Sequence, residues 1–202
     1  MQNVVIRAIE RLDFRTKEAY KTLRTNLSFA GKNVKVISLT SCTPNEGKTS
    51  VSFQLCLSLA ESGKKTILVN ADLRKSVLRG RYKANREKYG LSHYLSGQVE
   101  LDDACCRTNV NNFDIIFAGP VPPNPSELLG GDAFKNMLEV LRMQYDYVIV
   151  DTPPLGSVID AAIVGAICDG TVIVVESGAI SYKFVQNVKE QLNKVGCRIL
   201  GC

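Results

Sequence analysis

The sequence has little of what marks a membrane-spanning or exported protein. Its 202 residues contain no apolar run that approaches the roughly 18 residues needed to cross a bilayer. No signal peptide is visible at the N-terminus. We therefore expect a chain that is neither inserted into a membrane nor exported. Internal repeats and low-complexity linkers are also absent, and the length suits one α/β domain with a substantial core.

The composition gives equally little support to a metal–thiolate centre or to nucleic-acid binding. The seven cysteines form no Cys-x-x-Cys pair, and the single histidine, His93, has no partner at metal-ligand spacing. Cys56 and Cys168 lie within apolar runs, as small core residues of a reducing cytoplasm do. The adjacent Cys105 and Cys106 are the remaining place for a metal, and we favour a core role there too. The net charge of +5 is mild and does not by itself require nucleic acid.

The stretch that organises the chain is residues 41–50, Ser-Cys-Thr-Pro-Asn-Glu-Gly-Lys-Thr-Ser. An apolar run at 36–40 precedes it and an apolar-periodic segment at 51–60 follows it, which predicts a strand, a tight loop and a helix. Successive backbone N–H groups in such a loop point into one concavity, and the helix N-terminus adds partial positive charge. Lys48 would reach the β- and γ-phosphates of a nucleotide, and the Thr49 hydroxyl would bind Mg²⁺.

This loop departs from the usual phosphate-binding pattern because Cys42 stands where its first glycine is expected. Gly47 is retained, and without a Cβ it lets the backbone approach a phosphate closely. A Gly-Lys-Thr sequence alone can be an ordinary turn before a helix, but two later apolar runs that end in acidic residues argue against that interpretation. The residues predicted to contact the nucleotide are Thr43, Pro44, Asn45, Glu46, Gly47, Lys48, Thr49 and Ser50.

The two acidic residues are Asp72 and Asp151, which end the apolar runs 67–72 and 147–151. Ligands of open parallel sheets bind at the carboxyl ends of the strands, so these residues and Thr49 should converge on one Mg²⁺-nucleotide site. We assign Thr49 to the metal directly, Asp151 to the metal through water, and Asp72 to the metal or to the attacking group. Each aspartate singly could instead cap the helix that follows it. Their joint occurrence beside the phosphate loop favours the metal site.

The remaining pattern predicts a three-layer P-loop NTPase domain, an α/β fold with a mostly parallel central sheet flanked by helices. The βαβ spacing of the first two strands implies a right-handed crossover between parallel strands. Helices are predicted at 16–30, 90–97, 101–107, 132–142, 158–167 and 181–194, and a further helix starts at the Gly-Lys-Thr of 47–49 and ends near 63. Strands are predicted at 36–40, 66–70, 113–118, 145–150 and 171–176, with a further strand beginning at 198. The proline-rich residues 119–125 should form a rigid loop whose end is capped by Asn124 or Ser126.

The two ends of the sequence lead to separate expectations. Residues 1–15 are short and mixed in pattern, and we expect a tail that packs loosely or not at all. Residues 16–202 should form the P-loop domain. Because the strand that begins at Arg198 is incomplete, we expect the sequence to stop before the last strand of that domain.

Two charged stretches each allow two interpretations. A basic segment follows Asp72 and contains Arg79, Arg81, Lys83, Arg86 and Lys88. It is either a solvated surface or a docking patch for an acidic partner, a lipid headgroup or an acidic tail. On the first predicted helix, a polar stripe contains Glu18, Lys21 and Arg24. That stripe is most simply a solvated face, and its alternative is a contact between subunits.

The phosphate loop 43–50, the segment 67–75 and the segment 145–154 together resemble the bacterial tyrosine kinases (BY-kinases). These kinases belong to the MinD/ParA branch of P-loop ATPases and govern the assembly of capsule and exopolysaccharide. Residues 119–129, Gly-Pro-Val-Pro-Pro-Asn-Pro-Ser-Glu-Leu-Leu, resemble a stretch more particular to these kinases. Residues 18–24 are similar to the family's oligomerisation helix, Glu-x-x-Arg-x-x-Arg. The resemblance covers about residues 16–202.

The resemblance implies an ATP- and Mg²⁺-dependent autokinase that phosphorylates tyrosines of a neighbouring subunit. It implies catalytic roles for Lys48, Asp72, Asp151 and the position of Asn70. It further implies ring-shaped homo-oligomers that use Glu18, Lys21 and Arg24. The activator would be the cytoplasmic end of a membrane-bound polysaccharide co-polymerase, which would hold a cytoplasmic kinase at the inner face of the cell membrane. A cognate tyrosine phosphatase would be a further partner, and no nucleic acid is implied.

Three departures from the family pattern bear on activity. Asn70 occupies the position of a usual aspartate, and an amide cannot accept a proton. If that position acts as the base, we predict a slower kinase or one that relies on Asp72, and a rate increase on Asn70→Asp. Lys21 replaces an arginine and loses its bidentate fork, which predicts a weaker ring contact. The tyrosine-rich C-terminal tail and the final strand with its adenine contacts are missing from the sequence, so tail phosphorylation is not expected from these residues alone.

Two other functions compete with the kinase. A MinD/ParA-like ATPase switch usually carries an additional lysine in its phosphate loop, and Thr43 stands at that position here. A nucleotide-binding scaffold with weakened kinase activity is the second alternative, and Asn70 is the residue that supports it. The kinase is the predicted function.

Overall fold

The computed structural model describes residues 1–31, 33–85 and 88–202. Arg86 of the basic segment lies outside the described residues. The helices are α1 (Phe14–Phe29), α2 (Lys48–Glu61), α3 (Leu78–Arg81), α4 (Leu91–Leu95), α5 (Leu101–Ala104), α6 (Pro125–Gly130), α7 (Asp132–Gln144), α8 (Asp160–Gly165) and α9 (Tyr182–Lys194). The strands are β1 (Gln2–Val4), β2 (Val36–Ser41), β3 (Thr66–Asn70), β4 (Cys106–Thr108), β5 (Phe113–Ile116), β6 (Tyr147–Asp151), β7 (Gly170–Val174) and β8 (Ile199–Gly201).

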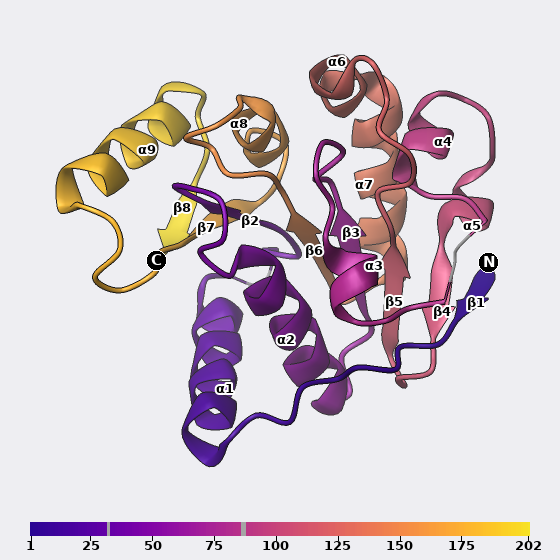
Figure 1. The fold of residues 1–202 in the computed structure, drawn as a ribbon, viewed down its shortest axis with the longest axis horizontal. Coiled ribbons are helices and arrows are strands. Elements are labelled where there is room, and N and C mark those ends of the chain that lie inside the picture. The colour runs from indigo at the N-terminus through magenta and orange to yellow at the C-terminus, as the bar shows by residue number, and fades with distance from the viewer. Residues whose placement is uncertain (32, 86–87) are drawn as a thin grey trace.

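The described strands form one eight-stranded sheet in the order β1-β4-β5-β3-β6-β2-β7-β8 (Figure 1). Neighbouring strands are parallel except β4 and β5, so β1 and β4 run against the rest of the sheet. The central strands β3, β6 and β2 are almost wholly buried, as strands covered by helices on both faces are. The predicted fold class, a mostly parallel α/β sheet flanked by helices, is confirmed.

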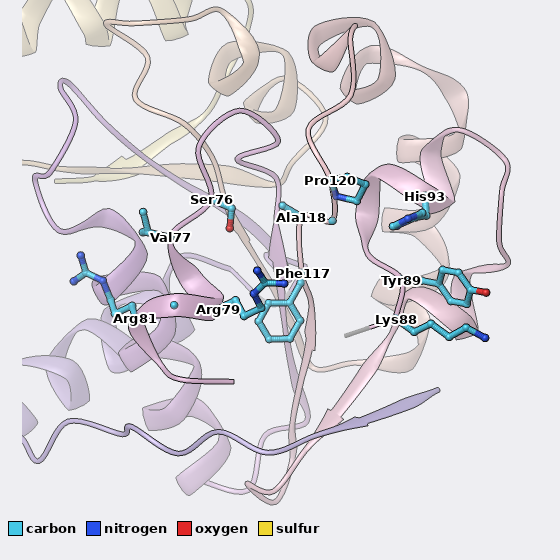
Figure 2. A pocket seen from close by; sticks show the side chains of 12 residues that line it. Ser76, Val77, Arg79, Arg81, Lys88, Tyr89, His93, Phe117, Ala118 and Pro120 are labelled. Carbon is cyan, nitrogen blue, oxygen red and sulfur yellow. The ribbon is translucent and has the colours of Figure 1, made fainter. Parts of the chain in front are cut away.

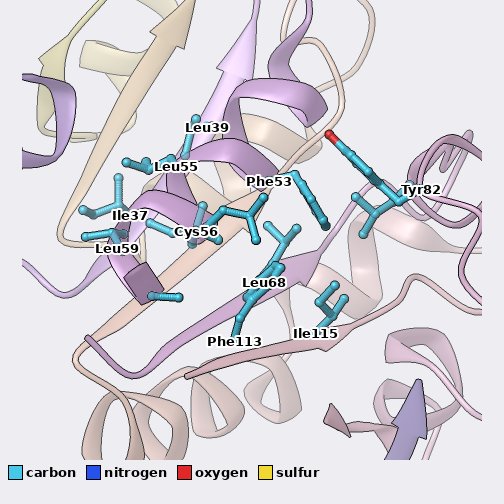
Figure 3. Close-up of a cluster of buried hydrophobic side chains, with 14 of the residues drawn as sticks. Ile37, Leu39, Phe53, Leu55, Cys56, Leu59, Leu68, Tyr82, Phe113 and Ile115 are labelled. Carbon is cyan, nitrogen blue, oxygen red and sulfur yellow. The ribbon is translucent and has the colours of Figure 1, made fainter. Parts of the chain in front are cut away.

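Alternating side chains of the central strands pack into two large cores, one on each face of the sheet, and a third apolar cluster forms around α8 and α9. In β3, Leu68 packs into the core that contains α1 and α2, whereas Ile67 and Val69 pack into the core that contains α7. In the first core, Phe53 of α2 meets Phe113 of β5 edge to face, with ring centroids 5.3 Å apart (Figure 3). The helices on the two faces and the sheet between them are the three predicted layers.

The N-terminal residues correct the prediction of a loosely packed tail. Strand β1 pairs in parallel with β4, from Gln2 opposite Cys106 to Val4 opposite Thr108. The side chain of Val4 is buried, and Ile6 enters the core beside α2. The predicted helix at 101–107 is also wrong in its second half, because it ends at Ala104 and the chain turns into β4. Both errors concern three-residue strands, which are too short to show a sequence period.

Two helix starts also differ from the prediction. Helix α1 begins two residues early, because the Asp13 side chain accepts a hydrogen bond from the Thr16 backbone N–H at 2.7 Å and so acts as the cap. Helix α6 is a separate element that starts at Pro125, a residue suited to the first helical position. Asn124 occupies its cap position, but its side chain accepts no hydrogen bond from a helix backbone N–H, and its amide donates to the Glu127 side chain.

Every helix in the described part of the chain is too short or too polar to cross a lipid bilayer. The part of the fold that concerns function is the edge where β2, β3 and β6 end together. There Leu39 of β2 and Asn70 of β3 both lie opposite Asp151 of β6. The residues that follow these strands therefore meet in space although they are far apart in sequence.

Candidate active site

The loop between β2 and α2 has the backbone of a phosphate-binding loop. Asn45 and Gly47 have positive φ angles of 69° and 84°, and α2 begins at the next residue, Lys48. The Glu46 side chain is buried and closes the loop from within. Its carboxylate accepts hydrogen bonds from the Thr43 backbone N–H and, at 2.8 Å, from the Thr43 hydroxyl. It also accepts from the Glu176 backbone N–H at 3.3 Å, so Glu46 contributes to the loop's shape through its side chain.

The cysteine in place of the usual glycine is explained by the direction of its side chain. Cys42 is fully buried in the apolar cluster formed around α8 and α9, away from the inside of the loop. Burial raises the pKa of its thiol to about 11, assisted by the nearby Glu46 carboxylate, so the thiol stays protonated. The backbone behind it is tight, because a Cβ on Gly156 would lie 2.2 Å from the Cys42 carbonyl oxygen. Cys42 is thus a core residue, as the other cysteines of apolar runs are.

Lys48, Thr49, Asp72 and Asp151 come together as the sequence predicts. Lys48 Nζ lies 3.5 Å from Asp72 Oδ2 and 3.8 Å from Asp151 Oδ1. The Thr49 hydroxyl donates to Asp151 Oδ2 at 2.8 Å. These side chains are buried, and they form a compact set of one cation, two carboxylates and one hydroxyl at the start of α2.

Asp151 is the most deeply buried of these groups. Only 1% of its surface is exposed, and burial raises the pKa of its carboxyl, which the charge of Lys48 and the hydrogen bond from Thr49 only partly offset. Ser52 also donates to Asp151, at 3.4 Å. Ser52 is not among the predicted site residues, although its position one helical turn after Lys48 is a signal that could have identified it.

Asn70 and Asp72 are linked by a turn of the backbone. The Asn70 side-chain oxygen accepts from the Asp72 backbone N–H at 3.2 Å, and its amide donates to the Ser76 hydroxyl. Asp72 Oδ1 accepts from the backbone N–H groups of Arg74 and Lys75, at 3.3 and 3.0 Å. This arrangement leaves Asp72 Oδ2 directed at Lys48. Both polar ends of the Asn70 side chain are engaged within the turn.

A second charged group braces that turn from outside. Arg74 Nε lies 2.7 Å from Asp160 Oδ2, and a second nitrogen donates to Asp160 Oδ1 at 3.1 Å. The Ser126 hydroxyl of α6 donates to the same carboxylate at 2.6 Å. Burial opposes ionisation of Asp160, but the hydrogen bonds from Arg74 and Ser126 outweigh it and hold its pKa below the ordinary value. The proline-rich segment is thereby tied to the turn that carries Asp72, a link that no short-range pattern signals.

The charged groups open onto a cavity of about 230 Å³. Its walls come from the phosphate loop, the turn after β3, α3 and the segment after β6, with Pro153 and Pro154 on one side. A wider cavity of about 870 Å³ adjoins it and shares Val77 and Arg81 with it. Figure 2 shows Arg79 and Arg81 of α3 pointing to different sides of this wider cavity. Asn70 lines neither cavity.

The oxygen-rich set suits a hard cation more than a soft one. Among the described residues no cluster of three or more His, Cys, Asp or Glu side chains could hold a metal alone. Mg²⁺ needs few protein ligands, because phosphate oxygens and water complete its octahedron. The Thr49 hydroxyl and the Asp151 carboxylate, 2.8 Å apart, are ligand types that fit that use. Cys105 and Cys106 are buried and form part of the cores.

The polar stripe of α1 lies apart from this site. Glu18 and Lys21 form an exposed ion pair of 2.7 Å. Arg24 turns toward α2, where it donates to the Ser58 backbone carbonyl at 2.6 Å. On another side of the same helix, Leu27 is buried in the core that also contains residues of α2.

Known proteins are similar to this chain in sequence and in fold. The AAA domain family matches residues 34–199. Tyrosine-protein kinase CpsD of Streptococcus agalactiae is 44% identical over 187 residues, which are 93% of this chain and 82% of the relative. The chain belongs to the bacterial tyrosine-protein kinase family. The solved kinase domain of Escherichia coli tyrosine kinase ETK matches 100% of the chain and 88% of its own length, with 33% identity and a TM-score of 0.88.

Membership of the tyrosine-protein kinase family confirms the predicted function and enzyme class over the partitioning switch and the scaffold. A structure of the septum site-determining protein MinD from Pyrococcus horikoshii OT3, complexed with Mg-ADP, is also similar. It has 25% identity and a TM-score of 0.68, and the match covers 82% of this chain and 67% of MinD. The tyrosine-protein kinase thus has the fold of the nucleotide-binding P-loop proteins.

Proposed function

We propose that this chain binds Mg²⁺-ATP and transfers the γ-phosphoryl group to tyrosines of a neighbouring subunit, in control of capsular or exopolysaccharide synthesis and export. The observation that carries the proposal is the convergence of Lys48, Thr49, Asp72 and Asp151 beside a phosphate loop, in a chain of the tyrosine-kinase family. Phosphoryl transfer requires chiefly positioning and charge stabilisation, which such a set supplies.

Each residue has a separate part in the proposed reaction. The loop backbone at 43–47 and the N-terminus of α2 bind the phosphates. Lys48 would neutralise charge on the transferring phosphoryl group. Thr49 and Asp151 would hold Mg²⁺, which would supply further charge neutralisation. Asp72 either accepts the proton of the tyrosine hydroxyl or shares in holding the metal. Asn70 acts through the turn, since its side chain supports the Asp72 backbone.

Assembly and partners follow from the family and form part of the proposal. Glu18, Lys21 and Arg24 would contribute to a ring-shaped homo-oligomer, in which Lys21 makes a weaker contact than arginine would. A membrane-bound polysaccharide co-polymerase would activate the kinase and hold it at the inner face of the membrane. A tyrosine phosphatase would reverse the modification. Nucleic acid is not among the proposed partners.

The proposal is tested by incubating the full chain with labelled ATP, Mg²⁺, a tyrosine-containing acceptor peptide and the cytoplasmic segment of the activator. We expect label on tyrosine only, and its loss in Lys48→Met. Lys64→Met, which changes an exposed lysine just beyond the other end of α2, is the matched control and should keep the activity. Label that persists in Lys48→Met, or an unlabelled wild-type reaction, would contradict the proposal.

A further inference from the structure

Arg81 reaches the phosphate loop from outside the residues assigned to nucleotide binding. It is the last residue of α3, and its Nη1 lies 2.5 Å from the Ser50 hydroxyl. Ser50 follows Thr49 in the first turn of α2, and Arg81 lines the same 230 Å³ cavity as Gly47 and Lys48. In Figure 2 the side chain extends past Val77, away from the centre of the wider cavity. A guanidinium is therefore present at the mouth of the loop.

The position of α3 is fixed by packing and does not depend on that hydrogen bond. Tyr82 stacks on Phe53 of α2, with ring centroids 3.5 Å apart and planes inclined by 15°. Leu78, at the start of α3, is fully buried in the same core. The Tyr82 carbonyl accepts from the backbone N–H groups of Arg7 and Ala8, each at 3.2 Å. The backbone that carries Arg81 is thus held against the helix whose N-terminus forms the loop.

The charge of Arg81 is not compensated by a carboxylate in the part of the chain that the structure describes. Lys48 has Asp72 and Asp151 nearby, and Arg74 has Asp160. Among the described residues no carboxylate lies within ion-pair distance of Arg81. Glu10 shares a small surface cavity with it but forms no ion pair with it.

Its one described partner is a hydroxyl beside a helix N-terminus, where a positive charge is unfavourable. Three positive features, Arg81, Lys48 and the end of α2, thus face one cavity. An anion bound there would be stabilised by all of them.

We propose that Arg81 is a phosphate-binding residue of the nucleotide site, which donates from its guanidinium to a phosphate oxygen of the bound nucleotide. The inference rests on the proposed function, because it requires that the cavity bind a nucleotide. Arg81 would add a second cation to the site, from α3. Unlike Lys48, this cation is not paired with Asp72 or Asp151. A planar guanidinium suits this contact, since it can donate two parallel hydrogen bonds to phosphate.

The test measures affinity and not turnover. Titration calorimetry with Mg-ATP, Mg-ADP and adenosine is carried out on the full-length wild type, Arg81→Ala, Arg81→Lys and Lys83→Ala. Lys83 is an exposed lysine two residues further along that lines neither cavity, so its substitution matches the loss of charge. Thermal unfolding of each variant checks that the fold is intact, as expected for a change at an exposed residue.

We expect Arg81→Ala to weaken Mg-ATP and Mg-ADP binding by about tenfold and to leave adenosine binding unchanged, because a hydrogen bond to a charged group is lost. Arg81→Lys should lie between Arg81→Ala and the wild type, and Lys83→Ala should match the wild type. Unchanged nucleotide affinity in Arg81→Ala, or an equal loss for adenosine, would overturn the inference while leaving the proposed function intact. A wild type that binds neither Mg-ATP nor Mg-ADP would overturn both.

Discussion

Two buried aspartates, Asp151 and Asp160, differ in how far their surroundings compensate their charge. Asp151 faces Lys48 at 3.8 Å and has hydroxyl partners, and burial raises its pKa. Asp160 is held by Arg74 at 2.7 Å and by Ser126 at 2.6 Å, and its pKa is lowered. The first charge is left partly uncompensated, as suits a site that receives a cation and phosphates. The second is fully compensated, as suits a structural brace.

The largest expected effect is on kinase activity and comes from removing the charge of Asp151. Asp151→Asn should lower tyrosine phosphorylation by at least about 100-fold, because a carboxylate proposed to hold Mg²⁺ is lost, and with it the charge neutralisation that the metal would give the transferring phosphoryl group. The same change should leave the melting temperature unchanged or raise it, because burial disfavours the charged carboxyl. Kinase assays and thermal unfolding on one preparation check both parts. A strongly destabilised Asp151→Asn would show that the two aspartates are alike.

The next largest effect is on stability and comes from removing Asp160, which holds Arg74 and Ser126 together. Asp160→Ala should lower the free energy of unfolding by about 2 kcal/mol, less than for a fully buried pair because 40% of the Arg74 side chain is exposed to water. Urea unfolding measures this change. Ser126→Ala, which removes one hydrogen bond to the same carboxylate, should cost less. A stability equal to that of the wild type in Asp160→Ala would rule out the brace.

A smaller effect on the kinase rate is expected from adding a second carboxylate beside Asp151. Asn70→Asp should raise the rate of autophosphorylation a few-fold, since an additional base is introduced directly opposite Asp151 in the sheet. The assay compares initial rates at saturating Mg-ATP. Because the Asn70 amide donates to Ser76, Ser76→Ala separates a change in the turn from a change in basicity. A rate that stays the same or falls in Asn70→Asp would count against a base at this position.

The smallest effect is a pH dependence of stability. The pKa of Asp160 is lower in the folded chain than its ordinary value of 3.8, so unfolding takes up a proton in acid. Its contribution to stability is therefore complete above pH 3.8 and is lost as the pH falls through the folded-state pKa. Unfolding free energies of the wild type and Asp160→Asn should converge in that acidic range. Parallel curves for the two proteins at all pH values would contradict the assignment.

Much of the fold could be predicted because its central strands are continuous apolar runs and its main helices repeat apolar residues at the helical period. Strand β3 has the predicted bounds, and β2, β6 and β7 lie within one or two residues of theirs. The short edge strands β1 and β4 could not be predicted, because three residues give no alternation to recognise. Their pairing depends on Gln2–Val4 meeting residues about a hundred positions away.

The sequence by itself determined the phosphate loop, its strand–loop–helix setting and the acids that end two strands. These features depend on local backbone geometry and on the rule that parallel strands end at one edge. Only the tertiary structure decided how each charge is compensated. Arg74 meets Asp160, Arg24 meets Ser58 and Arg81 meets Ser50 across gaps in sequence that carry no periodic signal. A side chain's partner is set by the packing of helices on the sheet, and that packing exists only in the folded chain.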